Sequence, residues 1–225
     1  MIIVVFSSLE FYANLVDSQI LLLVFGIIAI MLCLALILAF LIIKLTKSRR
    51  YRNSFGNRIY RLAMDNDYYL VHEFSFPTDE ENHILIDHIL FGDHYIYCIS
   101  DKYYEGVIDG EQHDQSWIFY PKGLSDKKEV IPNPLLANKK RIDKLALLTG
   151  ADRNFFISIV LFNNECYLED VQIKSRDEYI RNIKELPRLV EAIEKRPIEK
   201  INPEALKKAV NDIATLRDKY SKKTK

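Results

Sequence analysis

Residues 85–106 read LIDHILFGDHYIYCISDKYYEG, and this stretch decides the fold that the sequence predicts. Two apolar runs, at 84–91 and 95–100, flank the pair Gly92-Asp93, whose residue types favour turns. The pattern therefore predicts a β-hairpin. Asp87 lies inside its first strand, and Lys102 lies near the end of its second. Strand alternation places Leu85, Asp87 and Ile89 on one face of the sheet and Ile86, His88 and Leu90 on the other.

The segments around the hairpin alternate between helix and strand patterns. Upstream, we expect a helix at 54–65 capped by Ser54 and a strand at 68–76. Downstream, we expect short strands near 107–108 and 117–120, a helix at 133–149 opened by Asn133-Pro134, strands at 155–162 and 166–174, a helix at about 177–195 interrupted by Pro187, and a last helix from Asn202-Pro203. This order predicts an α/β domain with a mixed sheet flanked by helices and a helical C-terminal tail.

An apolar segment lies far upstream of the hairpin. Residues 20–43 are 24 consecutive residues without a charged or strongly polar side chain. At about 1.5 Å per residue, a helix of this length spans the roughly 30 Å hydrocarbon layer of a membrane. A cleaved signal peptide is the competing interpretation, but its basic start, its apolar run of about 7 to 15 residues and its small-residue cleavage site are missing. The sequence predicts a single transmembrane helix.

The charges on the two sides of this helix differ. Glu10 and Asp17 are the charged residues before it, whereas residues 44–61 hold seven Lys or Arg and no acid. The positive-inside rule then places the N-terminus outside the cell and everything from Lys44 onward in the cytoplasm. Each basic side chain beside a membrane adds about 1 kcal/mol of attraction to anionic lipid. We interpret the basic segment as a contact with membrane lipid, in preference to a DNA-binding arm.

Several sequence landmarks follow one another in a familiar order. They are Ile86-Asp87-His88, Lys102-x-x-x-Gly106, Trp117, Asn133-Pro134 and the run FFISIVLF at 155–162. With these landmarks, residues 54–163 resemble the nuclease-related domain (NERD) family, which has the PD-(D/E)XK or restriction-endonuclease-like fold. The resemblance implies a divalent ion held by a helix glutamate, the hairpin aspartate and a glutamate two residues before the lysine. The lysine would position or activate the attacking water.

The family's site residues transfer unevenly to this sequence. Asp87 and Lys102 match the hairpin aspartate and the lysine, so they are the candidate catalytic residues, and Asp87 is the candidate metal ligand. The glutamate before the lysine falls on Ser100, the helix glutamate on Asn57, and a glutamine that usually follows the Asn-Pro pair on Ala137. With one carboxylate, Mg²⁺ has little to hold it. We expect a degenerate site without a cofactor; Mg²⁺ belongs only to the alternative of an active nuclease.

Two neighbouring acids are candidates for the missing charge. Asp101 adjoins Ser100, but consecutive side chains of a strand point to opposite faces, so Asp101 would need a bulge to reach the Asp87 side. Glu73 lies in the preceding strand, from which a carboxylate can approach Asp87 across the sheet. Ordinary surface acids are the alternative interpretation of both.

The charge distribution argues against nucleic acid at the hairpin. Residues 62–116 contain thirteen Asp or Glu and a single basic residue, Lys102. Since polyanion binding draws much of its affinity from basic side chains, we expect this acidic face to repel nucleic acid. A second basic run lies on the predicted helix 133–149 and comprises Lys139, Lys140, Arg141 and Lys144. We interpret that run as a solvated helix face in preference to a nucleic-acid contact.

These patterns divide the chain into five parts. They are a short extracytoplasmic segment (1–19), the transmembrane helix (20–43), a basic juxtamembrane linker (44–53), the nuclease-related domain (54–163) and a strand plus helical C-terminal extension (164–225). The favoured function is a membrane-anchored cytoplasmic scaffold or protein-binding module, a pseudo-enzyme whose protein partner the sequence does not identify. A Mg²⁺-dependent nuclease of DNA or RNA with a rearranged metal site is the main alternative. A membrane-assembly protein that uses its acidic hairpin and C-terminal amphipathic helix is the third.

Overall fold

The computed structural model describes residues 2–77, 83–124, 127–169 and 171–221, and it describes side chains for 23–43 and, within those ranges, for 51 and 53–217. The chain divides into two compact units, Met1–Arg50 and Tyr51–Lys225. The first unit is helical and contains the segment Leu23–Ile43, which has a mean hydropathy of 3.2. By length and composition this helix is able to cross a membrane, and a signal sequence near an N-terminus passes the same test.

The first helix, α1 (Ile2–Asp65), runs without a break through the basic segment. The expectation that a helix starts at Ser54 was therefore wrong, because Ser54 lies inside α1, and residues 44–53 are helical as well. The physical reason is local. Residues 27–55 contain neither Gly nor Pro, and the Lys and Arg residues that fill the basic segment favour helix.

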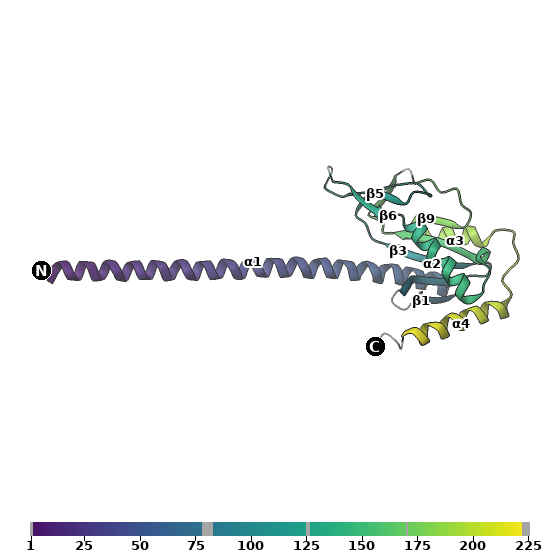
Figure 1. Cartoon of the computed structure of the whole chain (residues 1–225), viewed down its shortest axis with the longest axis horizontal. Helices are drawn as coiled ribbons and strands as arrows, with labels where there is room; N and C mark the ends of the chain where they lie inside the picture. Colours follow the sequence, from purple (N-terminus) through teal and green to yellow (C-terminus); the bar gives the residue numbers. More distant parts are fainter. Residues whose placement is uncertain (1, 78–82, 125–126, 170, 222–225) are drawn as a thin grey trace. The chain divides into compact units, whose positions relative to one another are not determined.

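The second unit contains two mixed sheets (Figure 1). The larger has the order β1 (Tyr69–Pro77), β2 (His83–Phe91), β3 (Ile96–Lys102), β7 (Phe156–Phe162) and β9 (Glu178–Asn182). Its first three strands are antiparallel, while β3, β7 and β9 are parallel. The smaller has the order β6 (Glu129–Pro132), β5 (Ser116–Pro121), β4 (Gly106–Asp109) and β8 (Cys166–Glu169). The predicted hairpin and mixed α/β sheet are confirmed.

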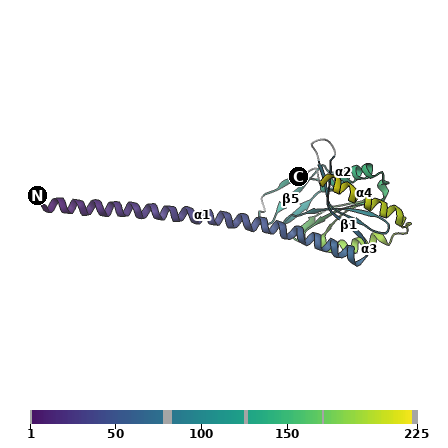
Figure 2. The same ribbon diagram turned by 90° about the horizontal axis from the view of Figure 1, so that it is seen from below.

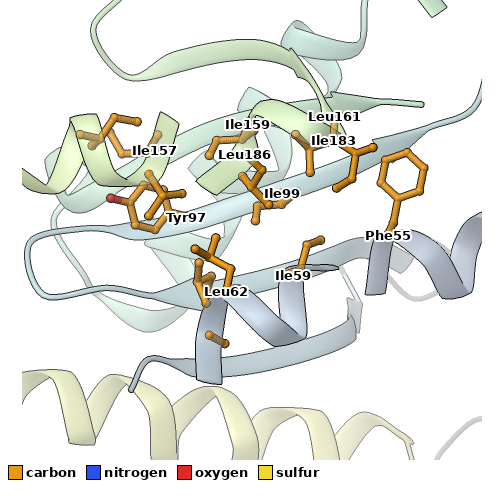
Figure 3. Packing of buried hydrophobic residues seen from close by; sticks show 14 of the residues in the cluster. Phe55, Ile59, Leu62, Tyr97, Ile99, Ile157, Ile159, Leu161, Ile183 and Leu186 are labelled. Carbon is orange, nitrogen blue, oxygen red and sulfur yellow. The ribbon is translucent and has the colours of Figure 1, made fainter. Parts of the chain in front are cut away.

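Helices cover both faces of the larger sheet (Figure 2). On one face, the end of α1 and the helix α3 (Leu186–Glu194) enclose a cluster that includes Phe55, Ile59, Tyr97 and Leu186 (Figure 3). On the other face, α2 (Pro134–Thr149) and α4 (Pro203–Ser221) cover a second cluster through Ile142, Leu145 and Ile213. The expected packing of the helices near 54–65 and 133–149 on the sheet is confirmed.

The strand alternation in the hairpin breaks at Asp87. Ile86 and Ile89 both belong to the cluster under α2 and α4, although they are three positions apart and strict alternation would place them on opposite faces. In β1, the matching residues Val71 and Phe74 also share that cluster, and Glu73 between them has a φ of 50°. The expectation that Ile86 faces away from Ile89 was therefore wrong. A left-handed residue in β1 distorts both strands, so that the faces change at the level of Asp87.

Three strands differ from their predictions, and the main difference is at residues 178–182. Residues 178–182, expected in a helix, form β9, because Glu178 and Ile180 turn the same way into the structure and pair with β7. The helix starts only at Leu186, next to Pro187, which helices accept in their first turn. The strand expected at 166–174 ends at Glu169, and β6 was not predicted. The apolar face of α4, the helix that the third alternative assigned to contacts with other proteins, packs on the β1 side of the sheet.

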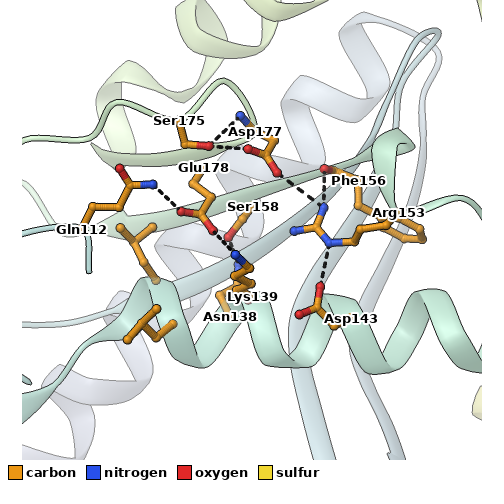
Figure 4. Close-up of polar contacts among 12 residues, drawn as sticks. Gln112, Asn138, Lys139, Asp143, Arg153, Phe156, Ser158, Ser175, Asp177 and Glu178 are labelled. Atoms are coloured by element: carbon orange, nitrogen blue, oxygen red, sulfur yellow. Dashed lines mark hydrogen bonds and ion pairs between the residues drawn. The ribbon is translucent and has the colours of Figure 1, made fainter. Parts of the chain in front are cut away.

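Polar contacts tie α2 to the parallel strands (Figure 4). The buried Asn138 donates to the Cys98 carbonyl at 3.0 Å and to Ser158 Oγ at 2.9 Å. Arg153 Nε donates to Asp143 Oδ1 at 2.8 Å, and its Nη1 donates to the Phe156 carbonyl at 3.0 Å. These bonds fix the helix against β3 and β7 and therefore set which residues of α2 reach the hairpin.

Candidate functional site

Asp87 lies half-buried in β2, where the two neighbouring antiparallel strands of the hairpin bring it close to Ser100 and Asp101 of β3. One of its oxygens, Oδ2, accepts two hydrogen bonds, from Ser100 Oγ and from the backbone N–H of Asp101, each at 3.0 Å. Ser100 stands where the resemblance calls for a glutamate. At that position a hydroxyl donates to the Asp87 carboxylate, whereas a second carboxylate would share a cation with it.

Ser100 also contacts α2. Arg141 Nη1 donates to Ser100 Oγ at 3.3 Å, and Ser100 itself is 1% exposed. The three side chains thus form a chain of contacts from guanidinium to hydroxyl to carboxylate. Since an arginine keeps its charge at all ordinary pH values, a permanent positive charge lies beside the candidate metal ligand.

Lys102 follows on β3. Burial lowers the pKa of its ammonium group below the usual value; Asp87 opposes this shift, and Arg141 adds to it. As predicted, Asp87 and Lys102 lie on adjacent antiparallel strands. Arg141 reaches the same region from α2 through Ser100.

Asp101 turns its carboxylate away from Asp87. Its Oδ2 lies 2.7 Å from His88 Nε2, and His88 Nδ1 lies 2.6 Å from His72 Nδ1 in β1. With Asp101 ionised, His88 carries its proton on Nε2, so its Nδ1 accepts from the Nδ1–H of His72. Burial raises the pKa of Asp101, and the hydrogen bond from His88 opposes that rise. The other oxygen of Asp101, Oδ1, is buried and has no hydrogen-bond partner among the described residues.

The remaining positions named by the sequence lie on three different elements, β1, α1 and α2. Glu73 is exposed at the distortion in β1, and its charge acts on His72. Asn57 is exposed on α1, about 200° around the helix from Phe55, a residue that packs on the sheet. Ala137 lies on α2 one turn before Arg141. Asp87 accepts hydrogen bonds from Ser100 and from the backbone of Asp101, and the Asp101 carboxylate is engaged by His88.

A divalent ion does not fit these residues. Mg²⁺ takes oxygen ligands and is usually held through one or two carboxylates and its remaining waters. Here Asp87 accepts two hydrogen bonds on one oxygen, and a guanidinium stands one hydroxyl away. Among the described residues, no group of three or more His, Cys, Asp or Glu side chains is placed to hold a metal ion. His83, His88 and His94 do not converge, since His88 pairs with Asp101 and His94 with Glu194.

A groove of about 650 Å³ runs between β2 and α2 beside these residues. Its lining includes His83, Lys140, Arg141 and Lys144, together with the acid Asp143. The excess of acids in residues 62–116 did not reveal these basic side chains, because α2 comes later in the sequence. The surface next to Asp87 is therefore acidic on the hairpin and basic on the helix.

Comparison with known proteins identifies the family. Residues 53–163 match the nuclease-related domain. The chain contains a nuclease-related domain. An uncharacterized protein of Bacillus anthracis is 26% identical over 125 residues, which cover 56% of this chain and 57% of that protein, so the match spans little more than half of this relative. No solved structure matches the chain significantly.

The nuclease-related domain holds two site residues that the sequence did not single out. Arg141 belonged to a basic run, but nothing in the run marked which of its four members turns toward the hairpin. His72 lies in the predicted strand 68–76, but the sequence alone does not give the register that pairs it with His88. Both depend on contacts between distant segments.

The histidine pair predicts a pH-dependent stability. Burial lowers the pKa of His72 below 6.5, and the neighbouring His88 adds to the shift. Because the pKa of His72 is lower in the folded state than in the unfolded state, the unfolded state binds more protons between these two pKa values. The contribution of this histidine to stability is therefore fully present above the unfolded pKa, and it is lost as the pH falls below about 6.5 toward the folded pKa. The free energy of unfolding should therefore decrease from pH 7.5 to 5.5, and His72→Gln should flatten this decrease.

The measurement is urea unfolding followed by the fluorescence of Trp117, the single tryptophan of the chain and 1% exposed. His113→Gln is the matched control, since it removes an exposed histidine. The raised pKa of Asp101 acts with the opposite sign, since it favours folding as the pH falls toward 3.8. An equal pH dependence of His72→Gln and the unmodified protein would show that His72 titrates alike in both states.

Proposed function

We propose that this chain is a membrane-anchored member of the nuclease-related family that has lost metal-dependent cleavage and acts by binding a partner. One observation carries the proposal: Ser100, where the family resemblance expects a glutamate, donates to Asp87 and accepts from Arg141. The site therefore keeps one of the carboxylates that the resemblance implies, Asp87, and places a fixed cation near it. That arrangement repels Mg²⁺ and leaves Lys102 without a metal-bound water to position.

The anchoring part of the proposal rests on the N-terminal helix. Leu23–Ile43 is long and apolar enough to span the bilayer, and the excess of basic residues directly after it favours an orientation with the second unit in the cytoplasm. In this orientation the basic segment contacts anionic lipid, and the nuclease-related domain is presented to cytoplasmic proteins. The partner class is protein, since the thirteen acids of residues 62–116 disfavour a polyanion at the hairpin.

A second candidate function, a Mg²⁺-dependent nuclease, is favoured by a different observation. The groove beside Asp87 carries Lys140, Arg141 and Lys144, which are suited to phosphates. In that case Lys102 would position the water, and Glu73 or Asp101 would supply the missing charge. The bond between Asp101 and His88 would have to break for that rearrangement.

The test is a cleavage assay with the full-length protein in detergent micelles. Single-stranded DNA, double-stranded DNA and RNA are incubated with Mg²⁺ or Mn²⁺, and we expect no cleavage above the protein-free blank. Asp87→Asn should leave this baseline unchanged. Metal-dependent cutting by the unmodified protein that both Asp87→Asn and Lys102→Ala abolish would replace the binding module with the nuclease.

A further inference from the structure

The side chain of Arg141 is placed by the packing of α2. On the same helix, Ile142 and Leu145 are fully buried against the sheet, and Asn138 is bonded to β3 and β7. With the helix held in this way, the half-buried Arg141 extends along the sheet to Ser100. Lys140 and Lys144 are exposed on the same helix and line the groove.

Charged side chains of both signs lie near Asp87. Asp87 and Asp101 bring two negative charges, and Lys102 and Arg141 bring two positive charges. The resemblance expects the lysine in active relatives alongside the metal, so Lys102 does not distinguish a working site from a degenerate one. Arg141 does, because its guanidinium contacts the residue that stands at the second carboxylate position.

We propose that Arg141 supplies, beside Asp87, the positive charge that a divalent ion would supply, and that it keeps such an ion away from this carboxylate. The proposal deepens the proposed function and rests on it, since it gives the degenerate site a residue that maintains the metal-free state. A full charge at this short range changes the binding constant of a divalent ion by more than a factor of ten. The loss of the second carboxylate and the presence of Arg141 are then two separate obstacles to metal binding.

If both obstacles act, the effects of Ser100→Glu and Arg141→Gln on the affinity for Mn²⁺ should not be additive. Ser100→Glu alone places a carboxylate against the Arg141 guanidinium, and the two will form an ion pair. This ion pair engages the new carboxylate, so the affinity for Mn²⁺ should rise little. Ser100→Glu combined with Arg141→Gln frees the carboxylate and removes the repelling charge, so the double variant should bind Mn²⁺ at least tenfold more tightly than Ser100→Glu alone.

The experiment titrates Mn²⁺ into the full-length protein in detergent, with free Mn²⁺ measured by its electron paramagnetic resonance signal. Lys144→Gln in the Ser100→Glu background is the matched control, since it removes an equal charge from the next turn of the same helix; we expect less than a threefold change. Arg141→Lys in that background keeps the charge and should stay within threefold of Ser100→Glu. Asp87→Asn added to the double variant should abolish the gained affinity, which locates the ion. Urea unfolding followed by Trp117 fluorescence checks that each variant is folded.

Each outcome decides between the proposals. If Ser100→Glu binds Mn²⁺ as tightly as the double variant, or if the folded double variant binds none, Arg141 does not exclude the ion. Either result overturns this inference and leaves the proposed loss of cleavage standing. An equal gain from Lys144→Gln would mean that only the general charge of α2 matters and would also overturn it. Cleavage by the unmodified protein in the assay above would instead overturn the proposed function.

Discussion

Removal of residues 1–43 should transfer the protein from the membrane fraction to the soluble fraction. Leu23–Ile43 is the one helix in the described part of the chain that is long and apolar enough to cross a membrane. Its large side chains, such as Leu36 at 70% exposure and Phe40 at 66%, have no protein partner to cover them. In water this surface is unfavourable at about 25 cal/mol per Å², whereas lipid accepts it. We expect almost complete release of the shortened chain and almost complete retention of the full chain after a high-salt wash.

Two point variants sharpen the test. Leu32→Arg together with Leu36→Arg places two charges in the middle of the span, at a cost of about 2.5 to 3.5 kcal/mol each, and should also release the protein. Leu32→Ala with Leu36→Ala is the matched control and should stay with the membrane. A full-length chain that washes off like a peripheral protein would contradict the anchor. An intact mass that begins after residue 43 would identify the helix as a cleaved signal sequence.

Asn133→Ala should cause a large loss of stability in the second unit. This side chain is 2% exposed and joins the start of α2 to the loop between β4 and β5. Its Oδ1 accepts from the backbone N–H groups of Leu135 at 2.9 Å and Leu136 at 3.4 Å. Its Nδ2 donates to the carbonyl oxygens of Glu111 at 3.4 Å, Gln112 at 3.1 Å and Asp114 at 2.7 Å. The loss of a cap costs about 0.5 to 2 kcal/mol, and an unpaired buried carbonyl costs about 1 to 3 kcal/mol. We expect a decrease of roughly 3 kcal/mol in the free energy of unfolding.

A second asparagine in the chain separates the two contributions. Asn202 caps α4 in the same way, accepting from Glu204 at 2.8 Å and Ala205 at 3.4 Å, but it is exposed. Asn202→Ala should therefore cost only the capping energy, about 1 kcal/mol. Asn133→Asp keeps the acceptor but sets a carboxylate against three carbonyls, so it should not restore stability. Urea unfolding by far-UV circular dichroism measures all three; equal effects of Asn133→Ala and Asn202→Ala would show that the loop contacts contribute nothing.

Local patterns predicted the hairpin and the helix α2 well. Alternating apolar residues around Gly92 are enough for two antiparallel strands, and the Asn133-Pro134 pair is enough to start α2. These signals lie within a few residues of one another, so the sequence contains them completely. The helical prediction for 178–182 was wrong because the segment EYIRN takes its strand conformation from pairing with β7, a long-range contact that outweighs local propensity.

The sequence predicted only those parts of the candidate site whose residues lie close together in the chain. The spacing of Asp87 and Lys102 follows from the hairpin, and the substitution at Ser100 was visible in the sequence. The turn of the Asp101 carboxylate to His88 and the contact of Arg141 with Ser100 were not. The first depends on the register of β2 and β3, and the second depends on the packing of α2 on the sheet.

The position of β7 between β3 and β9 has a consequence for how the protein is made. The matched family segment ends at residue 163, yet β9 and α3, which complete one edge and one face of the sheet, come later in the chain. At about 5 to 20 residues per second, a ribosome needs seconds to proceed from the end of β3 to the end of β9. During this time the hairpin carrying Asp87 has an open edge at β3 and then at β7, both rich in buried apolar residues. The open edge of a nascent chain in this state can pair with strands of other chains. Binding by chaperones therefore protects the chain most in the interval before residue 182 emerges.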